Sequence, residues 1–139
     1  MIKLQEETNG IRQVLTLPFP PSANRYWRFP RGLGYPLVSR EARAYKKLAA
    51  AKALQQGITP IDGDIQVRIY AFRPAKRGDI DNMLKVALDS LKGIAWKDDS
   101  QISFLTVVRF EDKANPRLEI EFANIQWRQR KPVVDYGFY

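Results

Sequence analysis

From Asp64 to Leu91 the sequence reads DIQVRIYAFRPAKRGDIDNMLKVALDSL. The residues of Asp64–Phe72 alternate in character, which predicts a strand. After the basic turn Arg73–Gly78 the apolar residues recur at helical spacing, which predicts a helix from about Asp79 to near Gly93. One face of the strand is expected to carry Ile65, Val67, Ile69 and Ala71. The apolar face of the helix is expected to carry Ile80, Leu84, Ala87, Leu88 and Leu91.

The rest of the chain supplies the neighbours of this strand and helix. A strand is predicted over Gln13–Pro18, followed by a loop over Ser22–Pro36. Ser39 is a typical N-cap for a helix that ends at Gly57, with an apolar stripe of Ala42, Tyr45, Leu48, Ala49 and Ala53. Two further strands are predicted at Ile102–Glu111 and Arg117–Phe122, joined by the turn Asp112–Pro116.

The predicted element order is β-α-β-α-β-β. This order favours a single compact α+β domain with a mixed sheet and helices packed on it. We expect the domain to span residues 1–124 and to be followed by a basic, aromatic tail at 125–139. No apolar run is long enough to span a membrane and the first residues lack a signal-peptide core, so a cytoplasmic protein is expected.

The amino-acid composition limits the kinds of catalytic and metal sites that the chain can form. The 139 residues carry a net charge of +8, which suits nucleic acid or an anionic membrane surface. The chain contains no cysteine and no histidine. A thiol nucleophile, a Ser-His-Asp triad and the usual zinc sites are therefore excluded. A bound metal would have oxygen ligands, which favours Mg²⁺, with Mn²⁺ as a possible substitute.

Four carboxylates stand out against this basic background. Asp79 and Asp81 lie where a strand passes into a helix, and Asp98 and Asp99 follow that helix. We expect the chain to fold back and bring one of the second pair beside the first. Carboxylates placed together repel one another unless a cation neutralises them, so the combination indicates a site for a hard metal ion. Such an ion polarises a phosphate and lowers the pKa of an attacking water.

A plainer interpretation stays open. Asp near a helix start is a normal cap, Asp81 and Lys85 are spaced for an exposed ion pair, and Asp98-Asp99 suits a turn. A calcium-binding EF-hand loop fits poorly, because Met83 occupies the third ligand position.

With these residues in view, the chain resembles the RusA family of Holliday-junction resolvases. Three segments carry the resemblance, in matching order and spacing: Leu17-Pro18-x-Pro20-Pro21-Ser22-x-Asn24-Arg25-Tyr26, Asp79-Ile80-Asp81-Asn82-x-x-Lys85-x-x-x-Asp89-x-Leu91 and Asp98-Asp99-Ser100-Gln101-Ile102. The resemblance implies a homodimeric, magnesium-dependent endonuclease that cuts four-way DNA junctions by paired nicks, in recombination and repair.

The resemblance also implies roles for individual residues. The essential carboxylates would be Asp79, Asp81 and Asp99, with Asp98 as a weaker candidate ligand. The essential lysine would be Lys85, which is placed to offset charge on the phosphate. Asn82 would steady the site by hydrogen bonding, and Asp89 would play a supporting role.

Basic residues outside the acidic motif are candidates for contacts with DNA phosphates. They are Lys76, Arg77, Arg25, Arg28, Lys46 and Lys47, with Arg31 as a further candidate. Tyr26 or Trp27 would either stack on unpaired bases or bury against the sheet. Three other functions stay open: a branched-DNA-binding protein without catalysis, a metal-dependent nuclease for flaps or RNA, and a small-molecule phosphohydrolase.

Overall fold

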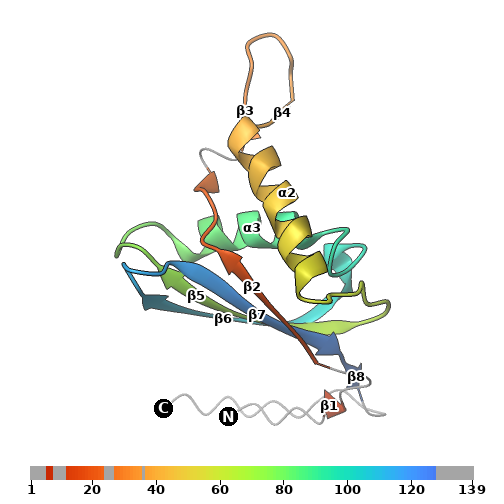
Figure 1. Ribbon diagram of the computed structural model, residues 1–139. Coiled ribbons are helices and arrows are strands. Elements are labelled where there is room, and N and C mark those ends of the chain that lie inside the picture. Colours follow the sequence, from red (N-terminus) through yellow and green to blue (C-terminus); the bar gives the residue numbers. More distant parts are fainter. Residues whose placement is uncertain (1–5, 8–11, 24–26, 36, 128–139) are drawn as a thin grey trace, which may run out of the picture.

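A four-stranded mixed sheet forms the centre of the protein (Figure 1). The computed structural model describes residues 6–7, 12–23, 27–35 and 37–127. The sheet consists of β2 (Gln13–Pro18), β5 (Ile65–Arg73), β6 (Ile102–Glu111) and β7 (Arg117–Asn124), in the order β2-β7-β5-β6. β5 and β6 are parallel, whereas β7 runs antiparallel to both β2 and β5. The predicted α+β architecture is confirmed.

Two helices, α2 (Arg40–Gln55) and α3 (Ile80–Leu91), cover the same face of the sheet (Figure 1). Ser39 caps α2 as predicted, because its hydroxyl accepts a hydrogen bond from the backbone of Ala42. The residues of the predicted α2 stripe are buried except Leu48, which is exposed.

The buried face of α3 is rotated from the predicted one. Met83, Val86 and Ser90 join Ala87 and Leu91 in the interior, while Ile80 is 39% exposed. The reason is that α3 packs on two partners. The sheet receives Met83, Ala87 and Leu91, and Val86 turns instead toward Ala42 on α2.

The core lies between the helices and the sheet. As predicted, Ile65, Val67, Ile69 and Ala71 point into it from β5. Trp96, in the segment after α3, is fully buried and packs edge-on against Phe122, with 5.8 Å between the ring centroids. Burial of an aromatic side chain of this size fixes the path of the chain between α3 and β6.

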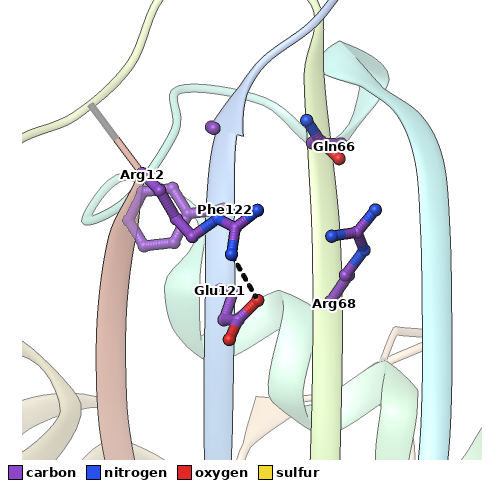
Figure 2. Close-up of a pocket in the computed structure, with 6 residues that line it drawn as sticks. Arg12, Gln66, Arg68, Glu121 and Phe122 are labelled. Atoms are coloured by element: carbon purple, nitrogen blue, oxygen red, sulfur yellow. Dashed lines mark ion pairs between the residues drawn. The ribbon is translucent and has the colours of Figure 1, made fainter. Parts of the chain in front are cut away.

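The opposite face of the sheet is not covered by a helix of the described residues (Figure 1). It presents Phe72 stacked on Phe110 and the guanidinium of Arg117 over Phe72. A cavity of about 10 Å³ lies on this face, beside the ion pair that Arg12 forms with Glu121 at 3.6 Å (Figure 2). A cavity of this volume has room for about one water molecule.

The turn after β6 connects strands that are not neighbours, because β5 lies between β6 and β7. Arg117 holds this turn by donating to Asp112 at 2.8 Å. The hydrogen bond from Arg117 lowers the pKa of Asp112, and hydrogen bonds to Glu119 and Asp112 raise the pKa of Arg117.

The shorter elements lie outside this central layer. Within the loop predicted for residues 22–36 and just beyond it, β3 (Trp27–Arg28) pairs with β4 (Leu37–Val38). β1 (Glu6–Glu7) pairs with β8 (Gln126–Trp127), where the predicted tail begins. A 3-10 turn, η1 (Asp99–Gln101), leads into β6. No helix among the described residues has the length and apolar character needed to cross a membrane.

Candidate functional site: two acidic ends of one helix

Asp79 and Asp81 lie at the start of α3. Gly78 makes the turn into the helix with a positive φ of 84°, a conformation that favours glycine. Asp79 is the N-cap residue, yet its side chain makes no capping hydrogen bond. Both carboxylates are exposed. An N-cap aspartate normally bonds the first turn of its helix, so Asp79 retains a carboxylate that the helix does not use.

Asp79 lines a pocket of about 500 Å³ between the chain after β2 and the end of the sheet. Three arginines line the same pocket: Arg73 from the end of β5, Arg77 from the turn and Arg109 from β6. Arginines can bind phosphate groups, and a carboxylate is a ligand that a hard cation prefers.

Arg73 and Arg109 were not predicted from the sequence. Arg109 donates to the backbone oxygen of Gly78 at 2.8 Å, which ties β6 to the turn before Asp79. Arg73 forms an ion pair with Glu111 at 3.7 Å, but its buried Nε has no hydrogen-bond partner among the described residues. The parallel register pairs Ala71 with Arg109 and Arg73 with Glu111, and that register could not be read from the sequence.

Asn82 and Lys85 complete this end of α3. The side-chain oxygen of Asn82 accepts from the backbone of Ala23 at 2.8 Å and holds the chain after β2 against the helix. Lys85 is exposed, and no ion pair among the described residues joins it to Asp81. The ammonium group of Lys85 is therefore available to a ligand.

The second acidic pair is held differently. Trp96 donates its indole N–H to Asp99 Oδ1 at 2.8 Å, so a fully buried ring orients this half-buried carboxylate. Asp98 caps η1, with a 3.4 Å hydrogen bond from the backbone of Ser100. Asp98 also lies 3.9 Å from Lys92. The interpretation of Asp98 as a cap is thus the one that the structure supports.

Gln101 fixes the loop that carries these aspartates. Its side-chain oxygen accepts from the backbones of Lys97 and Asp98, and its nitrogen donates to the backbone oxygens of Ile61 and Gly63. The glutamine of the Asp-Asp-x-Gln motif therefore connects the acidic loop to the segment before β5.

The two acidic pairs lie at opposite ends of the sheet. β5 leads into Asp79 and the parallel β6 begins just after Asp99, with α3 between them (Figure 1). The 12 residues of α3 alone span about 18 Å. Accordingly, no three acidic side chains of the described residues are grouped closely enough to hold a metal ion. The expectation that the chain folds back to bring Asp99 beside Asp79 is wrong for a single protomer.

The other predicted residues are scattered. Lys46 pairs with Asp89 at 3.1 Å and links α2 to α3. Lys47 and Lys76 are exposed, and only Arg77 lines the pocket beside Asp79. Asn24, Arg25, Tyr26 and the side chains of Trp27 and Arg28 lie outside the described residues, as do residues 128–139.

Comparison with known proteins places this arrangement in a family. Residues 18–123 match the family model of endodeoxyribonuclease RusA. The chain belongs to the RusA family. It is 36% identical over 110 residues to the crossover junction endodeoxyribonuclease RusA of Escherichia coli K12, with 76% of this chain and 89% of the relative covered. The RusA of Enterobacteria phage 82 is 34% identical over 112 residues, with the same coverage.

The match spans both acidic ends and the structural residues around them. It includes Asp79, Lys85, Trp96 and Asp99, as well as the pocket arginines Arg73 and Arg109. The predicted RusA resemblance is therefore confirmed.

Proposed function

We propose that this protein is a metal-dependent endonuclease that resolves four-way DNA junctions by paired, symmetric nicks. The observation that carries the proposal is the carboxylate of Asp79, which is unused by the helix it caps and lines a pocket with three arginines. Related RusA proteins are named crossover junction endodeoxyribonucleases. Our proposal extends that activity to this chain.

The donor set suits a hard divalent cation, with Mg²⁺ as the expected ion. Asp79 and Asp81 supply carboxylate oxygens that are exposed and not paired with any described cation. When bound, the ion polarises the scissile phosphate and lowers the pKa of an attacking water. Lys85 offsets the charge that develops on the phosphate, and Arg73, Arg77 and Arg109 take neighbouring phosphates.

One protomer does not complete this site. Asp99 belongs to the matched motif but lies at the far end of α3 from Asp79. A second copy, turned by a two-fold axis, would bring its Asp99 to the first copy's Asp79 and Asp81. We therefore infer a homodimer with two composite sites, each made from both protomers. Two sites related by a two-fold axis suit a substrate that needs two symmetric cuts.

The activity is tested with a labelled synthetic four-way junction and the matching linear duplex. We expect paired nicks in the junction alone, with Mg²⁺ or Mn²⁺ and not with EDTA. Asp79→Asn should bind the junction without cutting it, whereas Glu41→Gln on the exposed first turn of α2 should cut normally.

Three outcomes would count against the proposal. Tight junction binding without cleavage in any metal would make the acidic residues structural and the protein a branched-DNA binder. Equal cleavage of flaps or RNA would place it in another nuclease class. Full activity in Asp79→Asn would remove the proposed site.

A further inference from the structure

The two outer strands of the sheet have very different free edges. On β2, the side chain of Gln56 covers the outward backbone of Thr16: it accepts from the nitrogen at 2.8 Å and donates to the oxygen at 2.9 Å. Pro18, at the end of this strand, has no N–H to offer. The β2 edge is therefore closed to another strand.

The β6 edge is open. Over Ser103–Glu111, the described part of the chain supplies no hydrogen-bond partner to the backbone groups that point away from β5. The strand is 10 residues long and contains no proline or glycine. Leu105, Val108 and Phe110 are exposed along it, Phe110 to 45%. Natural proteins usually protect such an edge, because it is a template for another strand.

We propose that β6 pairs antiparallel with β6 of a second copy of this chain, joining the two sheets. This inference rests on the proposed function, which requires a partner that brings Asp99 to Asp79. In an antiparallel pair the start of one β6 lies beside the end of the other. The end of the partner's strand carries Arg109, which is bonded to Gly78 immediately before Asp79.

The same requirement restricts the register. Both helical layers must lie on one side of the joined sheet for the acidic ends to meet. Directly opposed residues of an antiparallel pair point to the same face. The two-fold axis is then perpendicular to the joined sheet and lies midway between the two copies of one residue, which oppose each other. Centring the pair on Val107 places Phe104 opposite the partner's Phe110, and such aromatic cross-strand pairs are stabilising.

The uncovered face of the sheet is a less suitable surface than the β6 edge for a partner that must bring its Asp99 to Asp79. Two ion pairs of this face are formed within the chain, Arg12 with Glu121 (Figure 2) and Arg117 with Glu119. Packing two such faces together would also leave the helices on the two outer sides, with two sheets about 10 Å apart between them. The acidic ends of the two copies would then stay separated.

The absence of native cysteine allows a direct test by single-cysteine variants of the full chain. Opposed residues of an antiparallel pair have Cα atoms about 4.5–5.5 Å apart, which a disulfide can bridge. Under mild oxidation, Val107→Cys should shift most of the protein to the mass of a covalent dimer on a non-reducing gel. Val14→Cys, exposed on β2, is the control and should stay monomeric on the gel.

Each result supports or overturns the proposal. Cross-linking of Thr106→Cys in place of Val107→Cys would overturn the register. Cross-linking of Val14→Cys alone, or of none of the three variants, would overturn the interface. The readout needs neither DNA nor metal. A chain that cross-links through β6 but cuts no junction contradicts the nuclease function alone, and one that cuts junctions without cross-linking contradicts the interface alone.

Discussion

The two ends of α3 carry the same kind of side chain in opposite circumstances. At the start, the Asp79 carboxylate makes no capping bond and lines a pocket with three arginines. Beyond the other end, Asp99 is held by the indole of Trp96, and Asp98 caps a turn. Within the described part of the chain, one acidic pair is left without a partner while the other is built into the fold. We infer that a complete site needs both ends, and so two chains.

The largest effect on cleavage should come from substituting Asp79, and the matching substitution of Asp98 should affect stability instead. Asp79→Asn removes no hydrogen bond or ion pair to the described residues, so cleavage should fall by about 10³-fold while the melting temperature stays the same. Asp98→Ala removes a cap, so the free energy of unfolding should fall by about 0.5–1 kcal/mol with cleavage largely retained. Single-turnover cleavage and thermal melts measure both. A reversed pattern would mean that the two roles are misassigned.

Lys85→Ala should lower the cleavage rate by about 10²-fold, because the ammonium group acts on the charge that develops during the reaction. Junction affinity should change little. Single-turnover rates at saturating protein separate the two quantities, and Lys113→Ala, in the exposed turn after β6, is the matched control. A loss of affinity with an unchanged rate would make Lys85 a simple phosphate contact.

Trp96→Phe tests the acidic residues beyond the C-terminal end of α3. The substitution keeps an aromatic ring in the core and removes the hydrogen bond to Asp99. We expect cleavage to fall about 10-fold or more, since a misplaced group at a reacting centre is costly. The discriminating measurement is a thermal melt of Trp96→Phe beside its single-turnover cleavage at a temperature where the variant is fully folded. A normal rate in the fully folded variant would show that Trp96 acts through stability only.

Arg109→Gln should produce the smallest change. The variant loses one cation of the pocket and the hydrogen bond to Gly78. Junction affinity should drop, and the slope of log affinity against log salt should decrease by about one unit. Binding titrations over a salt series measure this slope, with Arg43→Gln on the exposed side of α2 as control. An unchanged slope would show that Arg109 only supports the turn.

Much of the fold follows from local patterns in the sequence. The alternation in β5 assigned its buried face, and Ser39 marked the start of α2. The rotation of α3 was missed because helical spacing identifies an apolar side but not its neighbours. Val86 is buried only because α2 lies beside α3.

The residues of the candidate site could be chosen from the sequence, but their arrangement in space could not. The aspartates and Lys85 are recognisable from their spacing, whereas their separation depends on the parallel pairing of β5 with β6. A helix that connects two parallel strands leaves the residues before it and after it at opposite ends of the sheet. Arg73, Arg109 and Trp96 were missed for the same reason, because their roles come from pairing and burial.

The most direct test of the composite site mixes two inactive variants. Asp79→Asn and Asp99→Asn protomers are coexpressed with different tags, and the mixed dimer is purified through both tags. In this dimer one composite site carries both substitutions and the other carries none. We predict that the mixed dimer nicks one strand of a four-way junction, although neither variant alone cuts. A mixed dimer as inactive as its parents would contradict a site shared between two protomers.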